Sequence, residues 1–357
     1  MLEAGAVTPL WLRDVSLSPD GSTLLFTYKG DIFTVGANGG KATRLTTTPS
    51  YEQMPLWSPD GSQIAFASDR NGGTDIYIMP ATGGEATRLT FNSAEELPEA
   101  FTPDGKAVVY SAAIQAPAES RVFPSRRLTQ LWSVSTTGGR PQRILATPAK
   151  NPSFLPDGKS FLYHDVKGME DEWRKHHTSS VTRDIWRYDA ATGRHTNLTS
   201  RPGEDRQPVV SPDGSKMFFL SERDGGSFNV YVADLANPSA ATALTSFDTH
   251  PVRFLSRGAN GLLAFTYNGE IYTMPDTGGQ PRKVDIDILL DTPDEPVYRS
   301  FSSGADEAAV SPNGKEVAFA HRGDIFVTST DYKTTRQISD TPAPVSTPTW
   351  DSDNRTI

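Results

Sequence analysis

Short runs of alternating hydrophobic and polar residues, separated by turn motifs, make up most of this chain. The clearest run follows Ser58-Pro59-Asp60-Gly61, where Ile64 and Phe66 alternate with small or polar residues. A period of two predicts a β-strand with one buried face. Pro presets φ for a turn, Asp hydrogen-bonds its own backbone, and Gly tolerates a positive φ, so residues 58–61 are predicted to be a tight turn between two strands.

These two strands belong to a larger unit that extends to residue 90. A β-branched and aromatic run follows at 75–79, Gly83-Gly84 makes another turn, and Thr87-Arg88-Leu89-Thr90 ends the unit as a fourth short strand. One unit of four strands cannot bury its own faces, so further copies are expected beside it.

The composite pattern recurs along the whole chain. The turns after the first strand of its seven copies are Ser18-Pro19-Asp20-Gly21, Ser58-Pro59-Asp60-Gly61, Thr102-Pro103-Asp104-Gly105, Leu155-Pro156-Asp157-Gly158, Ser211-Pro212-Asp213-Gly214, the worn Asn260-Gly261, and Ser311-Pro312-Asn313-Gly314. A period of roughly 40–50 residues with four strands per unit is typical of a β-propeller. The predicted fold class is therefore all-β, a β-propeller of four-stranded antiparallel blades.

The joins between units predict where the ring ends. Unit one has its own first strand at Leu10-Trp11-Leu12, so six units are expected to close a ring. The acidic stretch after Val284 is the longest join and precedes the seventh unit. We predict a six-bladed propeller over 1–286, a linker over 287–305, and the start of a second propeller over 306–357 that continues past Ile357. The alternative is a seventh blade of the same ring.

Composition and motifs narrow the function. A net charge of −9 argues against a general nucleic-acid surface, and the chain has no apolar run long enough to predict a membrane span. With no cysteine, it has no disulfides, catalytic thiols or zinc–thiolate sites. It carries no Gly-x-Ser-x-Gly, no His-Glu-x-x-His and no phosphate-binding glycine loop. We therefore expect no catalytic constellation and no cofactor.

Units three and four each carry an insertion between their second and third strands, at residues 112–128 and 166–183. Such loops emerge on one face of a propeller, and insertions on one face often mark the working surface. We expect residues 170–183 to pack against residues 113–127 across the ring and to help form a substrate or partner surface. The alternative is that the loop only braces the ring. Its mixture of acids and bases suits internal pairing and specific recognition rather than general charge attraction.

The candidate substrate- or partner-binding residues on these insertions are Trp173, Arg174, Lys175, His176, His177, Arg183, Arg126 and Arg127. A tryptophan in a polar loop either packs onto a blade or is offered to a ligand. The basic side chains either balance nearby acids or receive a carboxylate. The adjacent histidines are a poor metal pattern because neighbours on a loop rarely point the same way, so no metal is expected. Ser179 and Ser180 lack an identifiable orienting partner for catalysis.

A Ser-acid-Arg motif ends the second strand in the two cleanest units, as Ser68-Asp69-Arg70 and Ser221-Glu222-Arg223. We expect the acid to accept hydrogen bonds from backbone N–H groups and the arginine to pair between blades, rather than to contact a ligand.

The Ser-Pro-Asp-Gly, Asp-Ile-Tyr and Arg-Leu-Thr pattern resembles the propeller repeats of TolB and of tricorn protease. Longer stretches resemble the N-terminal ring of bacterial tricorn homologues of the tail-specific serine peptidase class. They are Pro9-Leu10-Trp11-Leu12-Arg13, Phe101-Thr102-Pro103-Asp104-Gly105, Tyr163-His164-Asp165, the long stretch 173–186, Thr249-His250-Pro251-Val252-Arg253-Phe254 and Tyr267-Asn268-Gly269-Glu270-Ile271-Tyr272. The catalytic serine, histidine and acid of that family have no counterpart in this chain.

The resemblance implies the non-catalytic propeller part of a tricorn-like serine peptidase. Such a ring would guide or filter peptide substrates and dock to the downstream protease region of its own chain. The expected partners are peptides or unfolded polypeptide, with a homo-oligomer left open, and the expected compartment is the periplasm or the exterior, with the cytoplasm as the alternative. The rival interpretation is a TolB-like stand-alone protein-binding scaffold, and a third is a propeller glycan lyase.

Overall fold

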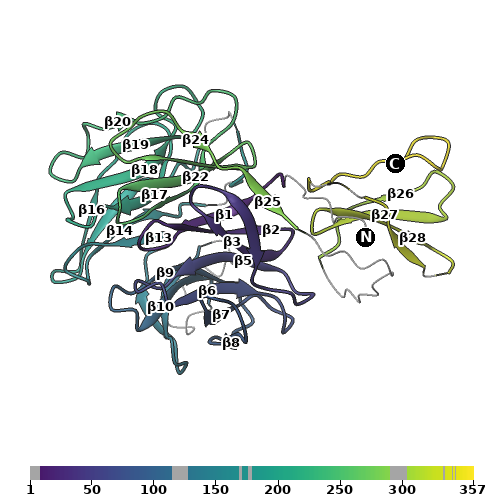
Figure 1. Ribbon diagram of the computed structural model, residues 1–357, viewed down its shortest axis with the longest axis horizontal. Coiled ribbons are helices and arrows are strands. Elements are labelled where there is room, and N and C mark those ends of the chain that lie inside the picture. Colours follow the sequence, from purple (N-terminus) through teal and green to yellow (C-terminus); the bar gives the residue numbers. More distant parts are fainter. Residues whose placement is uncertain are drawn as a thin grey trace.

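The computed structural model describes residues 9–114, 128–168, 171–175, 179–289, 304–332, 334–339, 341 and 343–357. Every regular element among these residues is a β-strand, and the strands form seven sheets (Figure 1). The predicted class, an all-β propeller of four-stranded antiparallel blades, is confirmed. No helix long and apolar enough to cross a membrane occurs in these residues.

Six of the sheets follow one another along the chain, each with four antiparallel strands. Their inner strands are β1 (Arg13–Leu17), β5 (Glu52–Trp57), β9 (Glu96–Phe101), β13 (Ala149–Phe154), β17 (Asp205–Val210) and β21 (Arg253–Arg257). The second strands are β2 (Thr23–Tyr28), β6 (Gln63–Ser68), β10 (Ala107–Ala112), β14 (Phe161–Asp165), β18 (Lys216–Ser221) and β22 (Leu262–Tyr267).

The third strands are β3 (Asp31–Gly36), β7 (Asp75–Pro80), β11 (Gln130–Ser135), β15 (Ile185–Asp189), β19 (Asn229–Asp234) and β23 (Glu270–Pro275). The outer strands are β4 (Gly40–Arg44), β8 (Thr87–Arg88), β12 (Gln142–Leu145), β16 (Arg194–Asn197), β20 (Thr242–Ala243) and β24 (Arg282–Lys283). We number the six sheets one to six in chain order.

Each inner strand lies beside the inner strands of the sheets before and after it, and β21 of sheet six lies beside β1 of sheet one. Six hydrophobic clusters fill the six junctions between neighbouring sheets. The cluster that joins sheets six and one includes Phe33 from β3 together with Ala264 and Ile271 from β22 and β23. The apolar face of every sheet is therefore covered by the next sheet around the ring.

The start of the first strand was predicted wrongly. Residues 10–12 precede β1, which begins at Arg13, and Leu12 donates its N–H to the carbonyl of Gly269 in sheet six at 2.8 Å. The short strand β25 (Ile286–Ile288) then adds to the outer edge of sheet one, parallel to β4. All four antiparallel strands of sheet one come from residues 13–44, and a later segment covers its outer edge.

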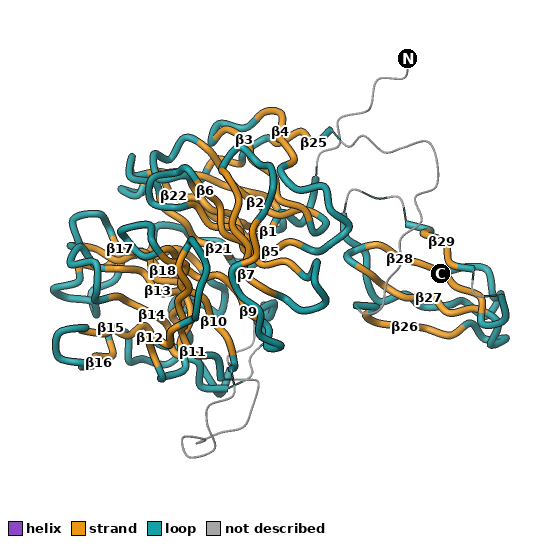
Figure 2. The backbone as a smooth tube through the Cα atoms, turned by 90° about the horizontal axis from the view of Figure 1, so that it is seen from below, coloured by secondary structure: helices purple, strands orange, loops and turns teal. Residues whose placement is uncertain are grey.

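The seventh sheet lies apart from the other six (Figures 1 and 2). Its strands are β26 (Asp306–Val310), β27 (Glu316–His321), β28 (Asp324–Ser329) and β29 (Thr335–Gln337). Arg322 contacts Asp69 at 3.1 Å and Lys29 contacts Asp324 at 3.2 Å, so ion pairs connect it to sheets one and two. Its strand β26 is mostly exposed, unlike the inner strands of the ring.

Side-chain hydrogen bonds explain why the turn motif repeats. In sheet two, Ser58 donates its hydroxyl to Asp60 Oδ1 at 2.6 Å, which also accepts the N–H of Ser62 at 3.0 Å, and Gln63 N–H bonds to Ser58 Oγ at 2.9 Å. The hydrogen bond from Ser58 lowers the pKa of Asp60 to about 2. Gly61 has φ of 72°, a conformation that favours glycine.

The Asp-Ile-Tyr and Arg-Leu-Thr motifs are two halves of one arrangement. Arg88 on β8 pairs with Asp75 at the start of β7 at 2.8 Å, and Thr90 Oγ1 accepts the N–H of Ile76 at 2.9 Å. Equivalent threonine hydroxyls accept the corresponding N–H groups in other sheets, in the pairs Thr46–Ile32, Thr199–Ile185 and Thr245–Val230. Each motif thus fastens a short outer strand to the strand beside it.

The Ser-acid-Arg motif makes its bonds within one sheet. The predicted role of the acid is confirmed, but the predicted pairing of the arginine between blades is wrong. Asp69 accepts the N–H of Tyr51 at 2.7 Å, as expected of a backbone-binding acid. Arg70, however, pairs at 2.9 Å with Glu52 on the inner strand of the same sheet, not with another blade. Sheet five repeats these bonds in the pairs Glu222–Glu204 (2.7 Å) and Arg223–Asp205 (3.3 Å).

Candidate functional site

The inner strands share a β-bulge near one end of the ring. The bulges place a non-glycine residue in the left-handed region with φ near 50°, at Asp14, Met54, Asn151, Gln207 and Phe254. A bulge removes a backbone N–H from the strand ladder, so the group needs another partner. Side chains of the preceding sheet accept three of them: Met54 N–H to Asp14 Oδ2 (3.1 Å), Asn151 N–H to Glu99 Oε2 (2.9 Å) and Gln207 N–H to His164 Nδ1 (3.3 Å).

This arrangement buries titratable groups at the end of the ring. Burial raises the pKa of Asp14 and of Glu99. Burial also holds the pKa of His164 well below its usual value, with the charge of Arg183 adding to the effect. Since His164 Nδ1 accepts a hydrogen bond, the proton of the neutral ring lies on Nε2.

Residues 171–175 form a turn that lies across this end of the ring. Asp171 Oδ1 accepts the N–H of Trp173 at 2.8 Å, and the Asp171 carbonyl accepts the N–H of Arg174 at 3.2 Å. Arg253 on β21 donates to the carbonyls of Glu172 and Arg174, the latter at 3.0 Å. The turn is therefore held through its backbone by sheet six.

Arg174 anchors the turn in sheet five. Its guanidinium pairs with Glu222 at 2.8 Å and Glu204 at 3.0 Å, and Arg183 pairs with the second oxygen of Glu204 at 2.9 Å. All four side chains are buried. Burial opposes the charge of Arg174, but its bonds to Glu222 and Glu204 outweigh burial and raise the pKa of Arg174. Such charge-assisted pairs fix geometry closely, and removing one partner leaves a buried charge uncompensated.

Glu172 carries the only half-exposed carboxylate among these described pairs, with 50% of its side chain accessible. Its Oε1 lies 3.3 Å from Lys150 Nζ on β13 and 3.3 Å from Arg183 Nη2. Burial alone would raise the pKa of Glu172, but the charges of Lys150, Arg183 and Arg206 outweigh it and lower the pKa to about 2. This carboxylate is therefore ionised at any physiological pH.

Trp173 completes the turn and is 43% exposed. Its ring makes an edge contact with Phe254 at 6.0 Å between centroids, and the guanidinium carbons of Arg13 and Arg253 lie 4.6 and 4.9 Å from its centroid. Cation–π contacts of this kind stabilise the ring by about 0.5–2 kcal/mol each. Through Trp173, Glu172 and Arg174 the turn contacts sheets one, four, five and six.

Four of the predicted binding residues are thus brought together: Trp173, Arg174 and Lys175 on the turn and Arg183 beside it. Lys175 Nζ lies 3.1 Å from His250 Nδ1. His176, His177, Arg126 and Arg127 lie outside the described residues, as does most of the predicted contact with residues 113–127. The structure describes no group of three or more His, Cys, Asp or Glu residues that could hold a metal.

The partners of these residues were not assigned to this site from the sequence. They are Lys150, Arg206, Arg253, Glu204 and Glu222. One signal was available: Glu204 and Glu222 occur at the strand ends where the Ser-acid-Arg motif of sheet five binds backbone. The predicted internal pairing holds for Lys167, which bonds to Asp184 at 2.7 Å, but Arg174 pairs outside the insertion.

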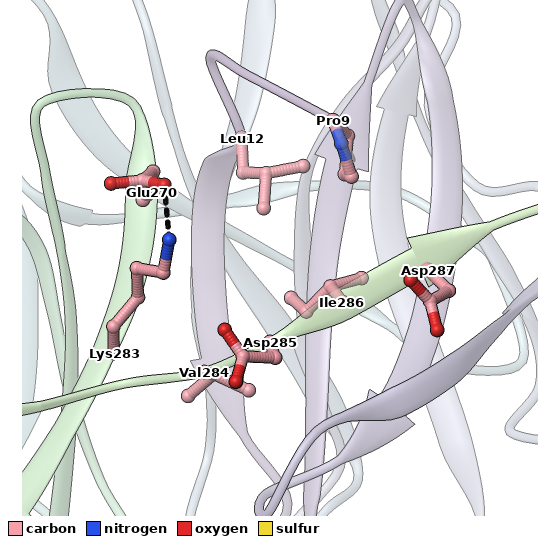
Figure 3. Close-up of a pocket in the computed structure, with 8 residues that line it drawn as sticks. All are labelled: Pro9, Leu12, Glu270, Lys283, Val284, Asp285, Ile286 and Asp287. Carbon is pink, nitrogen blue, oxygen red and sulfur yellow. Dashed lines mark hydrogen bonds and ion pairs between the residues drawn. The ribbon is translucent and has the colours of Figure 1, made fainter. Parts of the chain in front are cut away.

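A pocket of about 200 Å³ lies away from the turn, at the junction of sheets six and one (Figure 3). It is lined by Pro9, Leu12, Glu270, Lys283 and residues 284–287. Glu270 and Lys283, on the adjacent strands β23 and β24, pair with each other at 2.9 Å on one side of it (Figure 3). Because these charges are already matched and β25 forms one wall, we interpret the pocket as a seam of the closed ring.

Comparison with known proteins agrees with the fold. The family of the tricorn protease N-terminal beta propeller domain matches residues 9–280. Dipeptidyl-peptidase 5 of Porphyromonas gingivalis is 30% identical over 290 residues, which are 66% of this chain and 42% of that protein. The enzyme of the same name from Porphyromonas endodontalis is 27% identical over 263 residues, 59% of this chain and 37% of that protein. The chain thus spans less than half the length of these relatives.

Two solved structures share the architecture. The crystal structure of the tricorn protease superposes with a TM-score of 0.66 at 20% identity, covering 93% of this chain and 32% of that one. A TolB from Agrobacterium tumefaciens gives a TM-score of 0.54 at 21% identity, covering 67% of this chain and 82% of that one. At these identities the likeness concerns the fold. The family match over residues 9–280 is the stronger result, and by it this chain belongs to the family of the tricorn protease N-terminal beta propeller domain.

Proposed function

We propose that this chain is the non-catalytic propeller of a tricorn-like serine peptidase, and that its turn at 171–175 contacts peptide on the way to the protease region. The relatives of known name are peptidases, and the chain covers only part of each. The observation that carries the proposal is Trp173, a half-exposed aromatic held by two guanidinium groups at the end of the ring. Rigid, partly exposed aromatic and arginine side chains are the groups that most often dominate peptide binding.

The test replaces Trp173 in the full-length protein and measures peptide turnover. We expect Trp173→Ala to lower kcat/KM by about tenfold, the equivalent of about 1.4 kcal/mol. Phe91→Ala is the matched control, because Phe91 is also exposed and also stacked by an arginine, Arg88 at 4.6 Å, but lies at the outer end of sheet two. Equal kcat/KM for both variants and wild type, measured on the folded fraction, would contradict the peptide-contacting role.

The rival function is a stand-alone protein-binding scaffold of the TolB kind. The fold likeness to TolB, which covers most of that protein, favours it. The two functions differ in the polypeptide that they require beyond the ring: a peptidase needs a protease region in the same polypeptide, and a scaffold does not. Activity of the full-length protein on peptides, abolished by replacing a serine outside residues 1–357, would decide for the peptidase.

Three further features belong to this proposal. Residues 306–357 would begin a second propeller after a linker at 287–305, since the inner-strand position β26 is exposed in a way that a neighbouring blade would cover. The ring would dock to the downstream protease region of its own chain. The protein would work in the periplasm or outside the cell.

A further inference from the structure

Three cationic side chains and one neutral histidine lie at or near the carboxylate of Glu172. Lys150 and His164 are directly opposite each other on β13 and β14, Arg183 lies just before β15, and Arg206 lies on β17. Lys150 and Arg183 contact Glu172 Oε1, while His164 and Arg206 act on it through their charge or dipole. We call these four residues the basic cage.

The cage has more donors than the described acids accept. The Nε2 of His164 and the Nε of Arg206 are buried without a hydrogen-bond partner among the described residues, although both side chains are more than nine-tenths buried. Among the described residues, Arg206 has one ion pair, to Glu204 at the long distance of 3.7 Å, and Glu204 also pairs with two other arginines. Asp14 and Glu99 also lie near Glu172, and burial raises the pKa of both.

The contacts of Glu172 are longer than those of the neighbouring buried glutamates Glu204 and Glu222 with Arg174. Both of its ion pairs with described residues are 3.3 Å long and involve the same oxygen, and half of the side chain is accessible to solvent. The backbone of the turn is fixed independently, by Arg253 through two carbonyls and by Arg174 through two buried glutamates. The carboxylate can therefore leave the cage while the turn stays in place.

We propose that the basic cage of Lys150, His164, Arg183 and Arg206 is a carboxylate-binding site that Glu172 fills in the free protein and gives up to a peptide carboxylate. The cage itself stands on the contacts above, whereas the peptide as its ligand rests on the proposed function. Trp173, adjacent to Glu172, would then contact the residue that carries the incoming carboxylate. A tethered side chain competes as a ligand of millimolar effective concentration, so binding to the wild type is weak.

The test measures binding of acetate to the full chain by calorimetry at constant ionic strength. Glu172→Ala should bind acetate at least about tenfold more tightly than wild type, because the internal competitor is gone. Glu172→Gln keeps the shape of the side chain and should show a smaller gain in the same direction. Lys150→Met in the Glu172→Ala background should remove the gain. Glu270→Ala is the control, since it frees Lys283 from a comparable ion pair at 2.9 Å on the outside of the ring.

Acetate affinity that is equal in Glu172→Ala and Glu270→Ala overturns the cage. Variants are compared only where their circular dichroism matches wild type, and Glu172→Gln gives the same test if Glu172→Ala does not fold. Three N-acetylated tripeptides then identify the source of the carboxylate: one with a free C-terminus, one amidated, and one amidated with a glutamate side chain. Acetate binding without any peptide binding would support the cage and contradict the proposed function, so the two can fail separately.

Discussion

Two buried glutamates occupy the same place in neighbouring sheets, yet their replacement should have opposite effects on stability. Glu52 begins β5 opposite Ser68, and Glu96 begins β9 opposite Ala112. Glu52 accepts hydrogen bonds from three hydroxyls and pairs with Arg70 at 2.9 Å. In sheet three, the position equivalent to Arg70 is Ile114, so Glu96 is buried without that cation.

The electrostatic environment of Glu96 sets the size of the effect. Burial raises the pKa of Glu96 to about 7, and the charge of Asp75 adds to the rise. Neither oxygen meets full hydrogen-bond geometry with a described residue, although the hydroxyls of Thr90 and Tyr110 lie close. From an unfolded value of 4.5, the shift corresponds to at most about 3 kcal/mol, and to about 1–3 kcal/mol once screening at the sheet end is allowed for.

Proton binding sets the direction in which the free energy of unfolding changes with pH. A carboxyl with a raised pKa in the folded state binds more protons when folded than when unfolded between pH 4.5 and about 7. The free energy of unfolding therefore falls as pH rises through this window. Glu96→Gln removes the ionisation, so it should stabilise the protein by about 1–3 kcal/mol at pH 8 and change little at pH 4. Glu52→Gln should instead cost about 1.5–3 kcal/mol at pH 8, because Arg70 loses a charged partner.

Urea unfolding followed by tryptophan fluorescence at several pH values from 4 to 8 measures both effects. Each variant is a control for the other, since the same chemical change is made at the same strand position in two neighbouring sheets. A Glu96→Gln variant that is less stable than wild type at pH 8, or whose difference from wild type does not change with pH, would refute the reasoning.

The remaining predictions concern the buried ion pairs and the lack of catalysis. Arg174→Met should cost about 3–5 kcal/mol in thermal unfolding, because it leaves Glu222 buried without its arginine and removes one of the arginines that pair with buried Glu204. Arg44→Met, which removes a surface pair with Asp31, should cost less than about 1 kcal/mol, and equal costs would contradict the burial argument. A serine-directed covalent probe should label no residue of this chain, whereas labelling that a single serine replacement abolishes would contradict the non-catalytic assignment.

The repeating units were predictable because each motif closes on itself over a short distance. Asp60 organises a turn within five residues, and Thr90 accepts the N–H of Ile76, fourteen residues earlier. Because these bonds are local, they require the same residue types at the same spacing in each unit that makes them. The hydrophobic alternation predicted the second strands but not their full burial: β6 is buried on both faces, since all five positions after Gln63 are buried.

The inner strands were harder to predict because a bulge interrupts their alternation. In sheet one the apolar run at 10–12 was taken for the strand, but Asp14 in the left-handed region resets the pattern, and the strand is Arg13–Leu17. Polar residues such as Lys150 and Arg206 lie at the edges of these bulges, and such residues do not look like buried strand residues in sequence. Both nevertheless belong to the candidate site.

The partners of the turn could not be predicted because they are far from it in the sequence. Arg174 pairs with Glu204 and Glu222, which lie thirty and forty-eight residues away, and Arg253, which binds the backbone of the turn, lies about eighty residues away. A local balance of charge within the insertion gave no hint that its arginine is shared with the next blade. The same charges show why Glu172 is distinctive: the arginines on either side of it are buried in pairs, whereas Glu172 alone reaches into the basic cage from the solvent side. A carboxylate in that position is placed where an outside ligand of the same chemistry can replace it.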